Sequence, residues 1–210
     1  MTRDRGPLVL VHSEKNRYVK MYKQDAIDQH RTIASLTEKR MDKKPFFPMM
    51  YPPEIAAFEK LLVERAPTKV LEWGSGSSTL YWPPKFPNIQ WLSIEHQQFY
   101  ANFVRTRASP NVLLLHLGFP EYYELPNLPL QKFDLILVDG RQRVKCLAKS
   151  RYLLSDQGIV VLHDVWRERY SPAKEIYNKL TVLVPPAPVK DPRGLWMLEE
   201  PNFDWRPDGQ

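Results

Sequence analysis

Two closely spaced glycines at the end of a short apolar run form the segment of this sequence with the most chemical content. The segment Val70–Leu80 reads V-L-E-W-G-S-G-S-S-T-L, with β-favouring residues ahead of an acidic residue, Glu72. Gly74 and Gly76 permit a tight turn and a close approach of the backbone to a ligand. The hydroxyl residues at positions 77–79 can cap a helix that starts there. The pattern predicts a strand that runs into a nucleotide-binding loop.

A second acidic residue lies about 20 positions beyond the glycines, as in βαβ nucleotide sites. It is Glu95, which ends the apolar-rich predicted strand Trp91–Ile94 and precedes His96. A carboxylate at that place can accept hydrogen bonds from a ribose diol. The dinucleotide fingerprint requires a third glycine where this sequence has Thr79, which argues against NAD. The alternative to a nucleotide site is a βαβ turn that binds no ligand.

The run Glu72-Trp73-Gly74-Ser75-Gly76 resembles motif I of the class I S-adenosylmethionine-dependent methyltransferases, and Glu95 stands where that family has its second acidic residue. The resemblance covers roughly residues 52–199 and implies S-adenosylmethionine (SAM) as the cofactor. The residues that it assigns to cofactor binding are Glu72, Gly74, Ser75, Gly76, Ser78, Thr79, Glu95, His96 and Asp139.

Polar residues follow two further apolar runs that are typical of buried strands. Asp139 comes directly after Phe133–Val138, and His163 and Asp164 come after Gly158–Leu162. Ligands in open α/β sheets bind at the carboxyl ends of the strands, so these side chains are expected to face the ligand. If the two strands are neighbours, both carboxylates can approach one cation, and hard oxygen ligands suit Mg²⁺.

The segments F-D-L-I-L-V-D-G-R-Q-R-V and G-I-V-V-L-H-D-V resemble the O-methyltransferase branch that methylates hydroxyl groups of small molecules and carbohydrates. That resemblance implies an acceptor site lined by Asp139, His163 and Asp164, in some members around a metal. The sequence departs from the branch at Gln142, where a histidine is common. Asp139 and Asp164 are therefore candidates either for binding Mg²⁺ or another divalent cation, or for accepting hydrogen bonds from SAM or the acceptor.

Methyl transfer requires a positioned nucleophile and removal of its proton. His163 is the best candidate for the general base, because the ordinary pKa of histidine lies near neutrality. The alternatives are that His163 only bonds a backbone carbonyl, or that Asp139 or Asp164 removes the proton, directly or through a metal. Four arginines follow the same strand ends and could bind an acceptor carboxylate or phosphate, or be exposed first-turn residues of helices; they are Arg141, Arg143, Arg167 and Arg169.

The elements that position these residues alternate along the chain between strands and helices. Beyond the strands already named, helices are expected over Gln97–Ala108, Val144–Leu154 and Trp166–Leu180, with a helix from Pro52 and a strand over Val112–His116. Strands at Thr181–Val184 and Gly194–Glu199 are expected to form a closing hairpin. This order predicts a doubly wound α/β fold with a mostly parallel seven-stranded sheet, the Rossmann-like methyltransferase fold.

Composition agrees with one such domain of 210 residues. We expect an N-terminal extension over 1–50, with a strand at Leu8–Val11 and a helix at Asp25–Met41, a methyltransferase domain over 51–203 and a flexible tail over 204–210. A single cysteine, Cys146, excludes an intramolecular disulfide. No apolar stretch approaches 18 residues, which favours a soluble, cytoplasmic protein without a membrane span. The extension could serve as a lid, an acceptor-binding arm or a homodimer contact.

Three functions agree with the sequence. The leading one is SAM-dependent methylation of a hydroxyl group on a small-molecule or carbohydrate acceptor, which could be anionic. The second is methylation of nucleic acid or protein, which is favoured by an excess of basic residues, 30 Lys and Arg compared with 24 Asp and Glu. The sequence also argues against it, because Val138-Asp139-Gly140-Arg141 stands where amino-methylating nucleic-acid enzymes have an Asp/Asn-Pro-Pro-aromatic signature. The third is a non-catalytic binding or scaffold domain, although Glu72 and Glu95 would be poor choices for mere packing.

Overall fold

The computed structural model describes residues 46–126, 128, 131–188 and 192–206. The expected strand Leu8–Val11 and helix Asp25–Met41 lie outside the described residues. No helix within the described ranges has both the length and the apolar character needed to cross a membrane.

A seven-stranded sheet forms the centre of the fold, in the order β3-β2-β1-β4-β5-β7-β6. The first five strands are parallel, and β7 is antiparallel to both of its neighbours. The expectation of a doubly wound, mostly parallel sheet with a closing hairpin is confirmed. The strands are β1 (Lys69–Trp73), β2 (Gln90–Glu95), β3 (Val112–His116), β4 (Phe133–Val138), β5 (Leu154–His163), β6 (Tyr177–Val184) and β7 (Leu195–Pro201).

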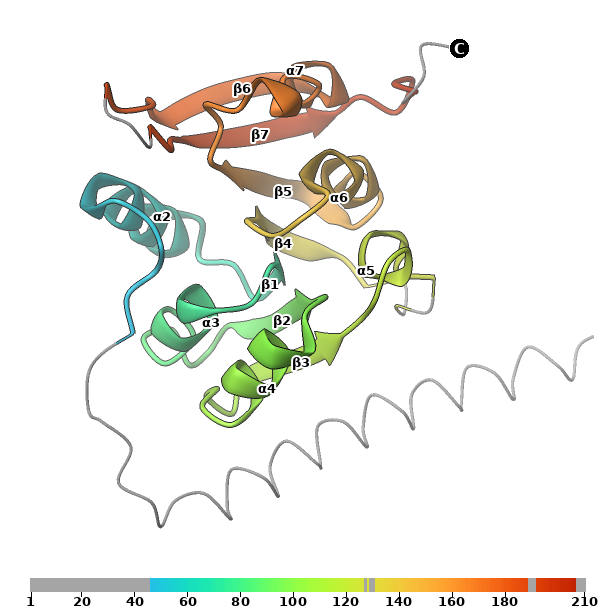
Figure 1. Ribbon diagram of the computed structural model, residues 1–210. Coiled ribbons are helices and arrows are strands. Elements are labelled where there is room, and N and C mark those ends of the chain that lie inside the picture. The colour runs from blue at the N-terminus through green and yellow to red at the C-terminus, as the bar shows by residue number, and fades with distance from the viewer. Residues whose placement is uncertain (1–45, 127, 129–130, 189–191, 207–210) are drawn as a thin grey trace, which may run out of the picture.

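Helices cover both faces of the sheet (Figure 1). On one face lie α2 (Pro52–Arg65), α3 (Ser77–Tyr81) and α4 (Gln98–Arg105). The other face carries α5 (Glu121–Glu124), α6 (Arg143–Ser150) and α7 (Ala173–Ile176). Because successive side chains of a strand point to opposite faces, each buried strand contributes to two separate cores.

The side chains of β1 point alternately to the two faces of the sheet, so its residues belong alternately to the two cores. Leu71 and Trp73 belong to the core beneath α5 to α7, whereas Val70 belongs to the core beneath α2 to α4. Glu72 therefore points to the same face as Val70, toward α3 and not along the strand axis. The strand ends, with Gly74 and Asp139, come together where β1 and β4 are paired.

The helix predicted over Trp166–Leu180 is wrong. The chain instead forms a 3₁₀ turn, η1 (Glu168–Tyr170), then the four-residue α7, and enters β6 at Tyr177. Pro172 interrupts a longer helix because it has no backbone N–H to donate. From Tyr177 on, the backbone pairs with β7, so the hairpin is longer than expected.

The last described residues continue to contact the domain. Trp205 packs partly buried against the core beneath α5 to α7, inside the segment expected to be a flexible tail. The guanidinium of Arg151 lies 5.3 Å from its ring centroid. Cys146, the single cysteine, is fully buried on α6.

Candidate cofactor and acceptor site

A cavity of about 490 Å³ opens at the carboxyl ends of β1, β2, β4 and β5. This is where ligands of open α/β sheets bind, and the volume falls in the range of small-molecule sites. Among the residues predicted from the sequence, all but two line it. Those that do are Gly74, Ser75, Gly76, Ser78, Glu95, His96, Asp139, Arg141, Arg143, His163, Asp164, Arg167 and Arg169.

The two loop glycines serve different purposes. Gly74 has φ of +96°, and a Cβ built on it would lie 2.5 Å from the Cα of Gly140, so the loops after β1 and β4 touch backbone to backbone. At Gly76 the added Cβ would meet no protein atom within 4 Å. The backbone at Gly76 is extended, and this residue lines the cavity. The space beside Gly76 is therefore open to the cavity.

Glu72 and Thr79 are the predicted cofactor residues that the structure places outside the cavity. Glu72 is fully buried, accepts hydrogen bonds from the Ser78 hydroxyl and, at 2.7 Å, from the Thr79 hydroxyl, and also from Trp91 and Ser93 of β2. Burial raises the pKa of Glu72 to about 7, although these bonds oppose the rise. Glu72 joins the start of α3 to β2, so it supports the loop without facing the ligand space.

Glu95 occupies the position that the sequence predicts for it, at the end of β2. Its Oε1 accepts hydrogen bonds from the backbone N–H groups of His96 and Gln97, at 2.9 and 2.7 Å. His96 Nδ1 also lies 2.9 Å from that oxygen, and the His96 ring stacks on Phe119 with centroids 5.0 Å apart. Within the part of the chain that the structure describes, Oε2 of Glu95 has no hydrogen-bond partner, so this oxygen is available to a ligand.

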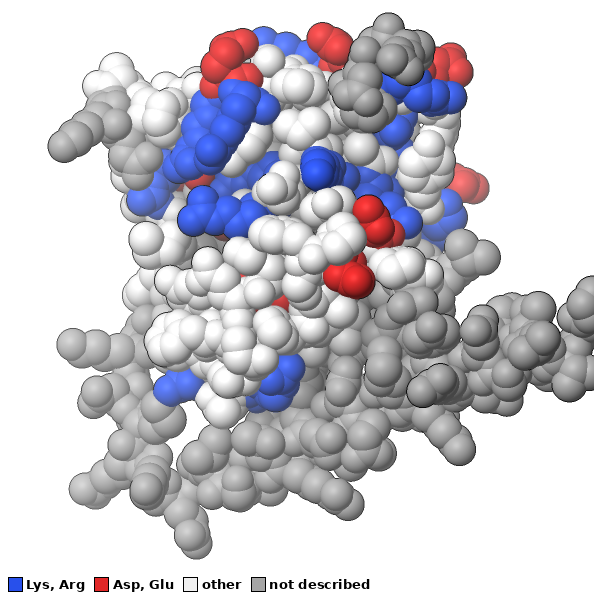
Figure 2. Space-filling model, turned by 45° about the vertical axis from the view of Figure 1, so that its right-hand side comes forward, with Lys and Arg blue, Asp and Glu red and all other residues white. Residues whose placement is uncertain are grey.

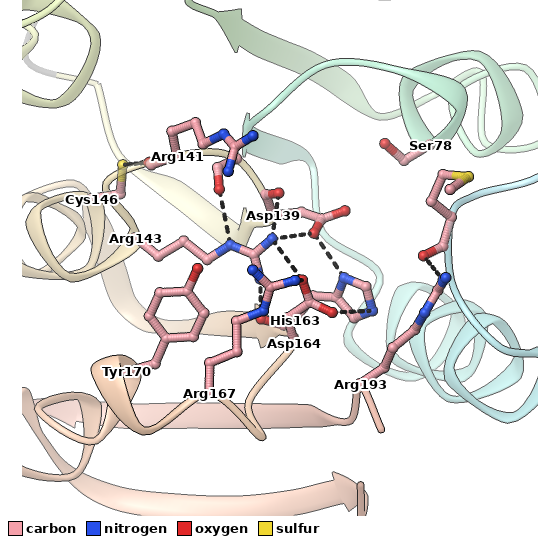
Figure 3. A network of polar contacts seen from close by, with 12 residues as sticks. Ser78, Asp139, Arg141, Arg143, Cys146, His163, Asp164, Arg167, Tyr170 and Arg193 are labelled. Carbon is pink, nitrogen blue, oxygen red and sulfur yellow. Dashed lines mark hydrogen bonds and ion pairs between the residues drawn. The ribbon is translucent and has the colours of Figure 1, made fainter. Parts of the chain in front are cut away.

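His163 lines the cavity, but its two ring nitrogens lie beside carboxylates; Figure 3 shows its contacts with Asp139 and Asp164. Its Nδ1 lies 2.7 Å from Asp139 Oδ1, and its Nε2 lies 3.4 Å from Oε1 of Glu54, a fully buried residue of α2. Burial would lower the pKa of His163, but the charge and hydrogen bond of Asp139, with Glu54, raise it to about 9. His163 is therefore protonated at neutral pH.

Arg143 lies between the two carboxylates that were candidates for a metal site. Its Nη2 is 3.0 Å from Asp139 Oδ1 and 3.3 Å from Asp164 Oδ2. Nε bonds the carbonyl of Gly140, and Nη1 bonds the carbonyl of His163. Every nitrogen of this buried guanidinium is occupied, so the prediction that Arg143 binds the acceptor does not fit its position.

The neighbouring strand ends do bring Asp139 and Asp164 to one cation, as expected, but that cation is Arg143. A divalent ion would have to displace a buried guanidinium, so these residues do not fit a metal. In agreement, the described ranges hold no group of three or more His, Cys, Asp or Glu side chains placed to bind one. The charges of His163 and Arg143 outweigh burial and lower the pKa of Asp139, which stays ionised.

The remaining predicted arginines differ in what they contact. Arg167 pairs with Asp164 at 3.2 Å and is half-buried. Arg141 is exposed at the start of the loop before α6, and its guanidinium has no partner among the described residues. Asp164 itself has φ of +60°, an uncommon conformation for a residue with a side chain, which turns its carboxylate back toward Arg143.

Glu54 and Tyr170 are site residues that were not predicted from the sequence. Glu54 accepts hydrogen bonds from the backbone N–H groups of Tyr51 and Gly194, at 2.6 and 2.7 Å, and so joins α2 to the start of β7. Tyr170 of η1 lines the cavity with its ring 5.2 Å from the Arg143 guanidinium. An acidic residue two places after a Pro-Pro helix start reads as an ordinary N-terminal residue, so no sequence signal marked Glu54.

Comparisons with known proteins identify the fold. No protein-family model and no curated protein matches the sequence. Among solved structures, the chain is similar to an O-methyltransferase from Bacillus cereus in complex with S-adenosylhomocysteine (SAH), with a TM-score of 0.56 and 13% identity over 83% of this chain and 89% of that one. A precorrin-6y C5,15-methyltransferase from Geobacter metallireducens gives 0.55 and 18%, over 78% and 93%.

A third similar structure is the 16S rRNA N2 G1207 methyltransferase of T. thermophilus in complex with AdoMet and guanosine. Its TM-score is 0.53 at 15% identity, and the match covers 79% of this chain and 45% of that one. The names of these three methyltransferases point to acceptors of different chemistry. At such identities the similarity shows that the chain has the Rossmann-like fold of class I methyltransferases, and it leaves the acceptor open.

Proposed function

We propose that this protein is a SAM-dependent methyltransferase that transfers a methyl group to a hydroxyl of a small-molecule or carbohydrate acceptor. The observation that carries the proposal is the open space beside Gly76, in a cavity that Glu95 also lines. Gly76 combines open space at the place of a side chain with a position in the cavity lining, so a ligand can approach its backbone closely. The methyltransferases of the same fold support the choice of cofactor.

The cavity residues divide into two groups in this proposal. The backbone of Ser75 and Gly76 and the carboxylate of Glu95 hold the cofactor, with Glu95 Oε2 accepting from its ribose hydroxyl groups. Ser78 and His96, which also line the cavity, complete this end of it. When bound, SAM supplies a methyl group activated by a positively charged sulfur.

The acceptor hydroxyl is held by Asp139 at the end of β4. Its Oδ1 accepts hydrogen bonds from His163 and Arg143. Its Oδ2 has no hydrogen bond to any described residue, and Asp139 lines the cavity. A hydroxyl oxygen becomes strongly acidic as its new bond to carbon forms, so a carboxylate of low pKa suffices to take the proton. His163 is then a positioning residue that orients Asp139, because it is already protonated at neutral pH.

Methylation of nucleic acid is a second candidate, since a ribosomal RNA methyltransferase is among the similar structures and arginines line the cavity. In that case, binding of RNA or DNA would weaken steeply as salt rises. A non-catalytic domain is the third candidate, and it would bind neither SAM nor SAH.

Calorimetric titration with SAM and SAH, with NAD as the control ligand, tests the proposal. We expect micromolar binding of SAM and SAH, none of NAD, and no effect of Mg²⁺, because Arg143 holds the place between the carboxylates. Folded protein that binds neither SAM nor SAH would refute the cofactor assignment. Asp139→Asn should bind SAH like the parent protein and lose turnover in an acceptor screen, whereas retained turnover would remove Asp139 from its proposed role.

A further inference from the structure

Two arginines beside the cofactor cavity have no acidic partner in the part of the chain that the structure describes. They are Arg141, in the loop after β4, and Arg169, in η1 after β5. Both are exposed, and neither forms an ion pair with a described carboxylate. Arg169 donates a hydrogen bond to the Tyr170 hydroxyl at 3.0 Å, and this bond orients the Arg169 guanidinium. The same guanidinium lies 5.0 Å from the centroid of the Tyr170 ring.

These two side chains connect the cofactor cavity to a second hollow of about 430 Å³. Arg141, Arg169 and Tyr170 line both spaces, and Phe119 and Gln142 line only the second. A ligand that extends from the region of Asp139 toward the second hollow would lie beside residues that both spaces share, the two arginines among them. The second hollow has the size of a small-molecule site.

The positive charge here is local and not a property of the whole domain. Residues 1–45 contain 11 of the 30 Lys and Arg and 6 of the 24 Asp and Glu, so residues 46–210 hold 19 against 18. Even so, blue side chains gather in a band across the upper half of the face in Figure 2. In the cavity, the carboxylates of Asp139 and Asp164 are already paired with Arg143 and Arg167. The charges of Arg141 and Arg169 remain uncompensated.

We propose that Arg141 and Arg169 bind a phosphate monoester group of the acceptor. Two guanidinium groups from different loops can bind different oxygens of one tetrahedral dianion, whereas a single guanidinium satisfies a carboxylate along its one edge. The Tyr170 hydroxyl, which accepts from Arg169, can donate its own proton to a third oxygen. Since the domain is nearly neutral overall, a compact phosphorylated molecule fits better than a nucleic acid, which requires an extended basic surface.

The inference rests on the proposed function, so the experiment measures phosphate and cofactor binding separately. Full-length protein is titrated with inorganic phosphate in the presence and absence of saturating SAH, and binding is followed by ³¹P NMR line width. Sodium acetate is the carboxylate probe, and a single-stranded RNA 12-mer at two salt concentrations is the nucleic-acid probe. Arg141→Gln and Arg169→Gln are compared with Arg105→Gln, which removes the same charge from the last turn of α4, away from the cavity.

We expect phosphate to bind in preference to acetate, with about tenfold weaker affinity in each cavity variant and near-parent affinity in Arg105→Gln. Equal loss in all three variants, no phosphate binding, or preference for acetate would overturn the inference. Salt-sensitive RNA binding much tighter than phosphate binding would replace it with the nucleic-acid function. Phosphate binding without SAH binding would refute the cofactor assignment and leave the anion site standing.

Discussion

Substitution of the two loop glycines by alanine separates a role in folding from a role in ligand binding. At Gly74, a Cβ would lie 2.5 Å from Gly140 Cα and 2.6 Å from Gly140 N, at a φ of +96°. The left-handed conformation costs alanine about 1–2 kcal/mol, and forcing apart two backbone segments adds about 1–3 kcal/mol. We therefore expect Gly74→Ala to lower the free energy of unfolding by about 2–5 kcal/mol, a fall of roughly 10 °C in Tm for a chain of this size.

Gly76→Ala should behave in the opposite way. The added methyl group meets no protein atom within 4 Å and the backbone is extended, so alanine is tolerated and reduces only the freedom of the unfolded chain. Stability should be unchanged or rise by about 0.4–1 kcal/mol. The methyl group occupies the space proposed for SAM, so SAH affinity should fall by about 1–3 kcal/mol, roughly 5- to 150-fold.

Thermal melting and calorimetric titration of SAH on the parent protein and the two variants test both statements. The expected result is a destabilised Gly74→Ala and a stable Gly76→Ala that binds SAH poorly. Parent-like SAH affinity in Gly76→Ala would show that the ligand space beside this glycine is not the cofactor site. Parent-like stability in Gly74→Ala would show that the contact with Gly140 is not formed.

Three further predictions concern the charged residues. Glu95→Gln should weaken SAH binding about tenfold in calorimetry with little change in Tm, because it keeps the side-chain shape and loses the charge that we propose binds the ribose. The pKa of His163 is raised to about 9, so its stabilisation is fully present below about pH 6.5 and is lost as pH rises through 9. Denaturant unfolding should show that loss, at most about 3 kcal/mol, in the parent protein, and its absence in His163→Asn above about pH 8, where Glu72 is already ionised, would confirm its source. Arg143→Lys should lower the free energy of unfolding by about 3–5 kcal/mol, because it leaves buried carboxylates incompletely paired; a loss below 1 kcal/mol would refute the ion cluster.

The sheet was predictable because each parallel strand is built around a short, mostly apolar run, which at most one or two polar residues interrupt, such as Glu72 in β1 and Asp134 in β4. Such runs are buried on both faces and stand out without any knowledge of their partners. The segment after β5 was not predictable in the same way. Its apolar residues are spaced compatibly with a helix, but Pro172 and the pairing of Tyr177–Val184 with β7 decide the backbone. Long-range strand pairing overrides local periodicity there.

At the site, the sequence predicted which residues meet at the strand ends but not what each side chain contacts. Glu72 was predicted to face the cofactor, yet its oxygens accept hydrogen bonds from Thr79, Trp91 and Ser93, which lie 7 to 21 positions along the chain. Glu54 reaches His163 only because α2 packs beside β5 and β7. Contacts of this kind join residues that are far apart in the sequence, so they depend on the packing of the fold and no local sequence pattern indicates them.

The charges at the strand ends pair with one another, whereas the exposed Arg141 and Arg169 form no ion pair with a described carboxylate. Glu54, Asp139 and Asp164 are matched by protonated His163, Arg143 and Arg167, so this cluster is balanced before any ligand arrives. Removal of one member would leave an unpaired charge in a buried environment, so substitutions in the cluster are destabilising. The same contacts keep Asp139 in one orientation. Arg141 and Arg169 are not members of this cluster, so their substitution does not leave a buried charge unpaired. Exchanging them should therefore alter which acceptor binds while leaving the cofactor loop and the cluster intact.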